Sequence, residues 1–375
     1  MRLLLLPALL GLAALATSCS APAEDAPVNT NPDGSSTVSG VTVRMGFFAQ
    51  KTATGEYVFP TYAAHLLGQT TKETLSDGTE VDRARHLVTI ELENTSDAPR
   101  NVTLTYELSG FSSQGKKTFA LAPKEKTVQY ADATLDVAKL GAVTAPVQAT
   151  YTYELEVDGK LLKANGIGLL VQPKENAFLT REGYTAQSTN ELLVGAMTTP
   201  NHPAIQSLLN IPGTTFSGYQ GITTEAQEVA VDRQLEAIYN AIKKRGVNYV
   251  STTQSFFAGV QRVRWPSQSL DPAISSANCL DGALLFAAAA EAIKLDVKVI
   301  FVPGHAFVAV NKTPAKQRTT TRNNFAVIET TMVGTNTYAQ ALDAGDKNVT
   351  VKYKGQVKPV DLATVRAKGF MPGPY

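Results

Sequence analysis

The sequence predicts two folded domains in series, an all-β domain followed by an α+β domain. Between residues 41 and 175, apolar and polar residues alternate in short runs separated by turn residues, which is typical of half-buried strands. After residue 195 the apolar residues recur at helical spacing, and short apolar runs follow them. A length of 375 residues is sufficient for two cores of ordinary size.

Two stretches illustrate the β pattern of the first domain. In residues 88–94, VTIELEN, every second residue is apolar, and the pattern resumes after the turn TSDAP. Residues 151–162, YTYELEVDGKLL, alternate in the same way and contain the tight-turn dipeptide Asp158-Gly159. Short strands joined by turns predict an immunoglobulin-like β-sandwich over residues 41–175. We expect this domain to be a spacer or a docking module.

The second domain, predicted over residues 195–375, contains a helix with recognisable ends. Thr224 and Gln227 have the spacing of a capping box, and Gly246 suits the end of a helix. The expected buried stripe of this helix consists of Val231, Leu235, Ile238 and Ile242.

A second helix is predicted to start near Cys279, in the run NCLDGALLFAAAAEAI. It is apolar nearly all round, which indicates a central, buried helix. Three short strands follow, with the sequences VKVIFVP, AFVAVN and FAVIETT. A helix buried against an antiparallel sheet is the simplest arrangement of these elements.

The N-terminal residues have the pattern of an export signal. Arg2 precedes an apolar run from Leu3 to Ala16, which is shorter than the about 20 residues that span a bilayer. Small residues then precede Cys19, and ATSC resembles the end of a bacterial lipoprotein signal. The resemblance implies a signal peptide over residues 1–18 and a lipid on Cys19. The alternative is a plain secretory signal with an incidental cysteine.

Residues 19–40 are rich in Pro, Ser, Asp and Gly and predict a flexible tether between a membrane anchor and the first domain. We therefore expect an exported protein, held in the cell envelope by lipid. Ser20 after the cysteine favours the outer membrane if the host is Gram-negative.

The charge balance argues against a nucleic-acid partner. Lys and Arg number 34 and Asp and Glu number 33, so the net charge is +1 and no strong field attracts a polyanion. No histidine or cysteine spacing suggests a zinc site. We expect neither a metal nor a cofactor.

The chain has two cysteines, and a lipid on Cys19 would leave Cys279 as a free thiol. Asn278 is a good N-cap residue, which places Cys279 at the first position of its helix. Unpaired backbone N–H groups and the helix dipole stabilise a thiolate there. The alternative is a small apolar residue that happens to begin a helix.

Two further residues are candidates for the same site. His305 follows the turn Pro303-Gly304 at the start of a predicted core strand, and Glu329 ends the next strand. A buried carboxylate needs a partner, and an imidazole on the neighbouring strand would supply one. The alternatives are a core histidine bonded to a backbone carbonyl and a solvent-exposed carboxylate.

A cysteine at a helix start, a histidine on the next strand and an acid on the strand after it resemble the transglutaminase-like (papain-like) thiol fold. The segments QRVRWPSQSL, NCLDGALLFAAAAEAI, VPGHAFVAV, IETTMVG and VDLATVRAKGFMPGP resemble its bacterial branch, over residues 195–375. The resemblance implies that Cys279 is the nucleophile, His305 the base and Glu329 the acid. The family's usual acid is Asp, which is one methylene shorter.

This resemblance implies a cysteine hydrolase or acyltransferase that acts on amide bonds of a protein or peptide, with hydrolysis by a peptidase or amidase favoured over cross-linking. The oxyanion would be bound by the backbone N–H of Cys279, with Gln261 and Asn278 as candidate side-chain donors. Because Asn278 is expected to cap the helix, Gln261 is preferred. The alternative function is a catalytically inactive, transglutaminase-like binding or scaffold module in the envelope.

Overall fold

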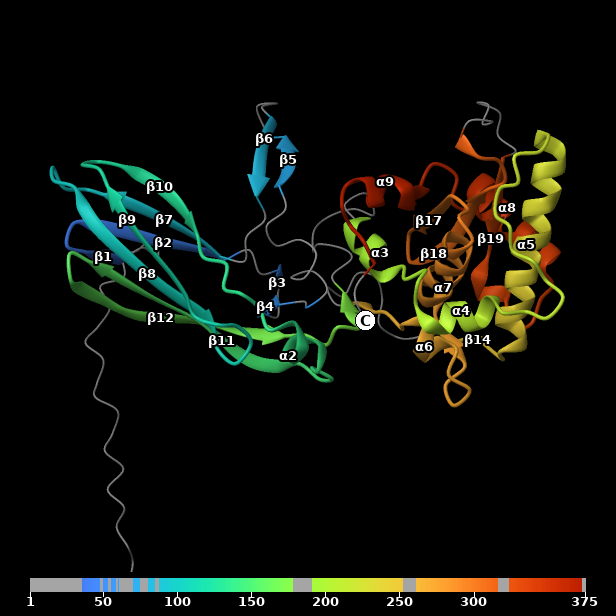
Figure 1. Ribbon diagram of the computed structural model, residues 1–375, viewed down its shortest axis with the longest axis horizontal. Helices are drawn as coiled ribbons and strands as arrows, with labels where there is room; N and C mark the ends of the chain where they lie inside the picture. Colours follow the sequence, from blue (N-terminus) through green and yellow to red (C-terminus); the bar gives the residue numbers. More distant parts are fainter. Residues whose placement is uncertain are drawn as a thin grey trace, which may run out of the picture.

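The structure is a computed structural model that describes residues 36–47, 50–52, 55–58, 60, 70–74, 80–84, 88–177, 191–251, 261–315 and 324–372. The predicted signal peptide, Cys19 and residues 19–35 of the predicted tether lie outside these ranges. Figure 1 shows a strand-rich N-terminal part and a helix-rich C-terminal part. The chain is thus a mixed protein that contains several antiparallel sheets and helices.

The N-terminal part is built on two main sheets. The four-stranded sheet has the order β1 (Ser36–Val38), β2 (Val41–Phe47), β7 (Val88–Asn94), β10 (Lys126–Tyr130). The six-stranded sheet has the order β3 (Gln50–Thr52), β4 (Gly55–Val58), β12 (Lys160–Val171), β11 (Val147–Val157), β8 (Arg100–Leu108), β9 (Gly115–Leu121). The remaining elements are the hairpin of β5 (Thr70–Thr74) and β6 (Glu80–Ala84) and the short helix α2 (Val137–Gly141).

The alternation of residue types explains why these strands form two sheets around one core. Ile90 of β7, Leu104 of β8 and Leu155 of β11 are completely buried. Next to them along the strands, Glu91, Glu154 and Glu156 are exposed, and Thr103 and Thr105 are half-buried. The turn between β11 and β12 is formed by Asp158 and Gly159, whose positive φ angles of 49° and 79° suit a two-residue hairpin. The predicted half-buried strands and this turn are therefore confirmed.

The strand β1 lies within residues 19–40, which the sequence predicts to be a tether. Ser36 pairs with Val43 and Val38 with Val41, so β1 and β2 form a hairpin. Sheet pairing therefore begins five residues before the predicted boundary at residue 41. Only three residues pair, and a strand so short has too few residues to give an alternating pattern.

The C-terminal part contains a four-stranded antiparallel sheet with the order β19 (Phe325–Ile328), β18 (His305–Asn311), β17 (Val297–Val302), β20 (Lys358–Asp361). Its helical elements are α3 (Glu191–Met197), α4 (Pro203–Leu209), α5 (Thr224–Lys244), α6 (Pro266–Ser269), α7 (Cys279–Ala292), η3 (Thr330–Met332), α8 (Tyr338–Lys347), the π-helical turn η4 (Asn348–Lys352) and α9 (Leu362–Ala367). Two-residue strands pair β13 (Asn176–Ala177) with β15 (Gln261–Arg262) and β14 (Asn248–Tyr249) with β16 (Ser276–Ala277).

The helix α7 lies at the centre of this part, as its sequence predicts. Phe286, Ala283 and Ala287 are completely buried, and the helix packs against β17 and β18 on one side and against α4 and α5 on others. A run of four alanines allows these neighbours to approach closely from several directions. The three predicted strands are confirmed as β17, β18 and β19, and β20 adds a fourth.

The helix α5 confirms the predicted buried stripe but not the predicted capping box. The four apolar residues of the stripe are at most 2% exposed. The N-cap is Thr223, whose side chain makes no capping hydrogen bond. The Gln227 side chain instead accepts hydrogen bonds from the backbone N–H groups of Gln220 and Gly221, at 2.7 and 3.2 Å. The loop before the helix takes the amide oxygen, because its own N–H groups need an acceptor.

The face of the β17–β18 sheet opposite α7 is covered by the chain that follows α8. Ile300, Val302, Phe307 and Ala309 form a small cluster against which Val349, Tyr353 and Val357 pack. The sheet is therefore enclosed between α7 and this segment. Within the described ranges, every helix is too short or too polar to cross a lipid bilayer.

Candidate active site

The first component of the site is Cys279 at the N-terminus of α7. The Asn278 side chain caps the helix, since its Oδ1 accepts a hydrogen bond from the Asp281 N–H at 2.8 Å. Asp281 Oδ2 in turn accepts one from the Asn278 N–H at 3.0 Å, which completes a capping box. The predicted cap is confirmed. Cys279 is a free thiol, 8% exposed, at a helix end that favours negative charge.

Asp281 also fixes the segment that runs beside the cysteine. This carboxylate is 1% exposed and accepts hydrogen bonds from the Arg264 backbone N–H at 2.8 Å and from its Nη1 at 3.1 Å. Burial raises the pKa of Asp281, although the bonds from Arg264 and Asn278 act in the opposite direction. The cap of α7 is therefore tied to the residues between β15 and α6, which limits movement of Cys279.

His305 is the first residue of β18, directly after a turn in which Gly304 has a φ of 70°. The antiparallel pairing of His305 with Val302 places the imidazole at the end of the sheet. Its Nε2 lies 2.7 Å from Glu329 Oε2. The rings of Phe307 and Tyr353 are centred 5.7 and 6.5 Å from the imidazole. The histidine is thus held between two aromatic rings and a carboxylate.

Glu329 follows β19 and caps η3, with four donors around its carboxylate. Oε1 accepts hydrogen bonds from the Thr331 N–H at 3.1 Å and from Thr331 Oγ1 at 2.6 Å. Oε2 accepts one from Asn348 Nδ2 at 2.7 Å and faces His305 at the same distance. The side chain is buried, at 5% exposure for the residue. The carboxylate is therefore both desolvated and well satisfied by hydrogen bonds.

Glu329 and His305 each favour the charged form of the other. Burial by itself raises the pKa of Glu329, but the hydrogen bonds and charge of His305 and the bonds from Thr331 lower it below its ordinary value. Burial by itself lowers the pKa of His305, but hydrogen bonds to Cys279 and Glu329, and the charges of both, raise it to about 10. The thiol and the carboxylate that flank the imidazole therefore favour its protonated form. Because Nε2 faces Glu329, Nδ1 is the nitrogen that remains for Cys279.

The two candidate oxyanion donors, Gln261 and Asn278, lie on different elements and make different hydrogen bonds. Gln261 lies on β15, is 4% exposed, and donates from its Nε2 to the Arg262 carbonyl at 2.7 Å. Asn278 adjoins Cys279 and uses its amide oxygen for the helix cap. Since capping uses Oδ1, the Nδ2 group of Asn278 is still a candidate donor. Both side chains therefore stay candidates, and the preference for Gln261 stays a prediction.

Two residues of the site are not revealed by the sequence pattern. Thr331 follows Glu329 by two residues, a spacing at which a carboxylate can accept the backbone N–H at a helix start. Asn348 is separated from Glu329 by the whole of α8, and no motif connects them. The first could have been inferred from local capping rules, whereas the second depends on how α8 packs.

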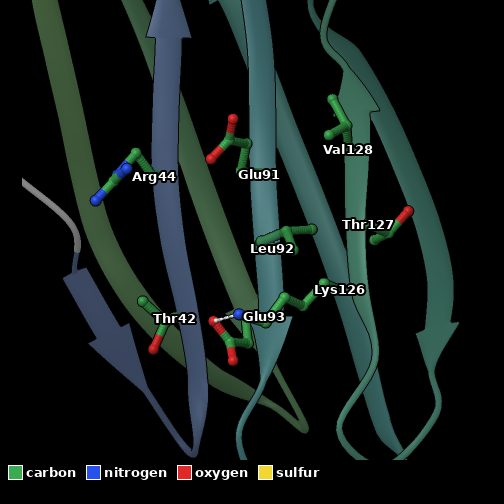
Figure 2. Close-up of a pocket in the computed structure, with 8 residues that line it drawn as sticks. All are labelled: Thr42, Arg44, Glu91, Leu92, Glu93, Lys126, Thr127 and Val128. Carbon is green, nitrogen blue, oxygen red and sulfur yellow. Dashed lines mark ion pairs between the residues drawn. The ribbon is translucent and has the colours of Figure 1, made fainter. Parts of the chain in front are cut away.

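A groove in the described part of the chain lies in the N-terminal part and includes none of these residues. It has a volume of about 450 Å³ on the face of β2, β7 and β10, and Figure 2 shows Arg44, Glu91, Glu93 and Lys126 along it. Lys126 and Glu93 form an ion pair at 3.0 Å. The eight residues that line the groove include no cysteine or histidine. This groove therefore offers neither a thiol nor an imidazole.

The described residues contain no group of three or more His, Cys, Asp or Glu side chains that could hold a metal ion. Neither protein-family models nor curated proteins give a match to this chain. The chemistry of the site must therefore be inferred from its own geometry. That geometry is a cysteine at a helix N-terminus, a histidine beside it and a buried glutamate that contacts the histidine.

Proposed function

We propose that this chain is a cell-envelope lipoprotein whose C-terminal domain has a transglutaminase-like fold and acts as a cysteine hydrolase or acyltransferase on amide bonds. The N-terminal part would then be an immunoglobulin-like sandwich that spaces or docks this domain. The observation that carries the proposal is the contact series from Cys279 to His305 and from His305 to Glu329, at 2.7 Å for the second pair. A nucleophile beside a base, with a third group that orients the base, is the arrangement that activates a thiol for catalysis.

The proposed reaction follows from these positions. The Cys279 proton passes to His305 Nδ1, which gives a thiolate–imidazolium pair. The thiolate sulfur attacks the carbonyl carbon of the amide, and the C–N bond breaks as His305 returns the proton to the leaving amine. The acyl group then remains as a thioester on Cys279. Water releases a carboxylic acid from it, or an amine takes the acyl group. Glu329 keeps the imidazole oriented and offsets its charge throughout.

The oxyanion formed during attack needs fixed donors. The backbone N–H of Cys279, at the start of α7, is one. Asn278 and Gln261 are both candidates for the second donor: the Asn278 cap uses Oδ1 and leaves Nδ2, and the Gln261 Nε2 group uses one of its two N–H bonds on the Arg262 carbonyl. Hydrolysis remains favoured over cross-linking, and a protein or peptide is the proposed substrate.

The burial of Cys279 favours a second candidate function, an inactive scaffold module. Its exposed fraction of 8% limits access to a bulky substrate. In that case the buried cysteine would serve packing, and partner binding would not need a thiol.

A covalent probe distinguishes the two functions. The folded protein is treated at pH 6 with a peptide vinyl sulfone, which is an amide-like electrophile, and the labelled residue is mapped by mass spectrometry. An enzyme is expected to be labelled at Cys279 within minutes, because His305 lies beside the thiol and can take its proton. Labelling that occurs only after denaturation would instead identify a scaffold. The variant Cys279→Ser controls for labelling elsewhere.

The membrane anchor is tested by replacing Cys19. Cys19→Ala is expected to release the protein from the membrane fraction or to stall its processing, because the proposed lipid has no other attachment point. The measurement is the distribution of the protein after membranes are washed with salt. Cys279→Ala is the matched control and should stay with the membrane. If Cys19→Ala also stays there, the lipid anchor is wrong.

A further inference from the structure

One face of α8 packs directly against β19, the strand that Glu329 follows. Gly345 lies so close to β19 that a Cβ built on it would be 2.3 Å from the Val327 carbonyl oxygen, so only glycine fits there. The Glu329 N–H donates to the Ala341 carbonyl at 3.0 Å. Ala341, Gly345 and Asn348 are spaced i, i+4 and i+7, which places them on the same side of the helix. This face therefore contacts both the backbone and the side chain of Glu329.

The helix ends in an unusual turn at the point where it reaches the carboxylate. Asn348 caps α8 and also begins the π-helical turn η4, in which the Tyr353 N–H donates to the Asn348 carbonyl at 2.9 Å. Turns of this kind are rare and occur frequently at functional sites. Here the turn directs two side chains to the site: Asn348 Nδ2 contacts Glu329 Oε2 at 2.7 Å, and the Tyr353 ring lies 6.5 Å from the His305 ring.

We propose that Asn348 is a positioning residue that, with Thr331, holds the Glu329 carboxylate in the orientation that contacts His305. The catalytic meaning of this role rests on the proposed function. Thr331 binds Oε1 and Asn348 binds Oε2, so rotation of the carboxylate breaks at least one of these bonds. A glutamate side chain has one more rotatable bond than aspartate, and the two holding residues remove that extra freedom.

Among the described residues, few charged or titratable groups near Glu329 can add their own titration to the pH profile of the site. His305 of β18 contacts it directly, and Cys279 of α7 contacts that histidine. Tyr239 of α5 interacts with the charge of Glu329. Burial and that charge raise the pKa of Tyr239 to about 12, so the phenol stays neutral below pH 10. The Lys352 Nζ, on η4, lies 4.8 Å from the centre of the Tyr353 ring. The acidic part of a pH profile therefore reports on Glu329, His305 and Cys279.

The test is the rate of Cys279 alkylation by iodoacetamide between pH 4 and 9, in wild type and Asn348→Ala. Removal of the Asn348 donor leaves the buried carboxylate charge less well satisfied, so the pKa of Glu329 rises. The imidazolium then loses its counter-charge at a higher pH. We expect the acidic limb of the profile to move up by about one pH unit, with a rate about tenfold lower on that limb.

The matched control is Thr350→Ala in the same turn. The Thr350 Oγ1 donates to the Asp346 carbonyl at 2.8 Å and is not one of the donors to Glu329. This variant is expected to keep the wild-type profile even if its melting temperature falls. Asn348→Asp, which has nearly the same shape, places a second carboxylate beside Glu329 and should move the limb further in the same direction.

The possible outcomes separate this inference from the proposed function. A wild-type protein that alkylates rapidly below pH 8, with an unchanged profile in Asn348→Ala and Asn348→Asp, overturns the positioning role and keeps the enzyme. An equal shift in Thr350→Ala overturns it too, since the effect would then belong to the turn as a whole. A wild-type protein without rapid alkylation below pH 8 overturns the proposed enzyme, and the catalytic role of Asn348 with it.

Discussion

Replacing His305 with alanine is expected to slow the alkylation of Cys279 at pH 7 by about thirtyfold, because a thiol without a base ionises near pH 8.5 and only a few per cent of it is then thiolate. Turnover of an amide substrate should fall further, by about 10²–10⁴-fold, since the same residue also protonates the leaving amine. The measurement is the second-order rate constant with iodoacetamide from pH 5 to 10. The wild-type rate is expected to be flat around neutrality, and the variant rate should rise tenfold per pH unit.

His202→Ala is the matched control for this experiment. His202 caps α4, where its Nδ1 accepts a hydrogen bond from the Ala204 N–H at 3.1 Å. Its loss affects that helix end and should leave the alkylation profile unchanged. Circular dichroism establishes whether each variant is folded. Identical profiles for wild type and His305→Ala would contradict a thiolate–imidazolium pair and support the scaffold function.

Replacing Glu329 with glutamine is expected to reduce turnover by about 10²–10⁴-fold, because the imidazolium loses its counter-charge and its fixed orientation. The carboxylate accepts from donors at both oxygens, whereas an amide has a single oxygen. One side of the substituted amide must therefore place N–H against N–H. We expect the free energy of unfolding to fall by about 1–3 kcal/mol, measured by denaturation with urea at pH 7. Unchanged turnover would show that the acid plays no part.

Glu329→Asp examines why this chain has the longer acid. The Glu329 carboxylate reaches His305, Thr331 and Asn348 simultaneously. An aspartate is one methylene shorter and cannot keep all three contacts without movement of the backbone. We therefore expect a large loss of turnover. Activity that is equal to or above wild type would mean that the site is not built around the glutamate.

The pH dependence of stability follows from the two shifted groups. The pKa of His305 is raised to about 10, so its contribution to stability is full below the ordinary value of 6.5 and is lost as the pH rises through 10. The pKa of Glu329 is lowered, so its contribution is full above the ordinary value of 4.5 and is lost as the pH falls through the lowered value. The pair therefore stabilises the fold most between these limits, and Glu329→Gln should flatten the dependence on both sides.

Local sequence rules were sufficient for much of this structure. Alternation placed the strands β7, β8 and β11, and the Asp158-Gly159 turn followed from the few residues that accept positive φ. Asn278 predicted the start of α7, because capping involves residues only three positions apart. Each of these features is decided within a few residues of chain, and the amino-acid types there carry the information.

The same rules failed where two local partners competed. Thr224 and Gln227 have the spacing of a capping box, yet the Gln227 oxygen accepts from the preceding loop. Strand β1 lies within the predicted tether, since it gains its stability from pairing with β2 and not from its composition. The spacing of residues in the sequence limits which hydrogen bonds can form, and the segments that pack nearby determine which of them does form.

The candidate site shows the same division. The types and positions of Cys279, His305 and Glu329 made them candidates before any fold was known, because nucleophile, base and acid chemistry needs those side chains. Only the tertiary structure brought His305 and Glu329 to 2.7 Å and added Asn348, which α8 places beside the carboxylate through the close approach of Gly345 to β19. The sequence determined which groups could react. Packing between elements distant in the chain decided which of them meet, since such contacts depend on how helix and sheet faces fit together and not on residue spacing.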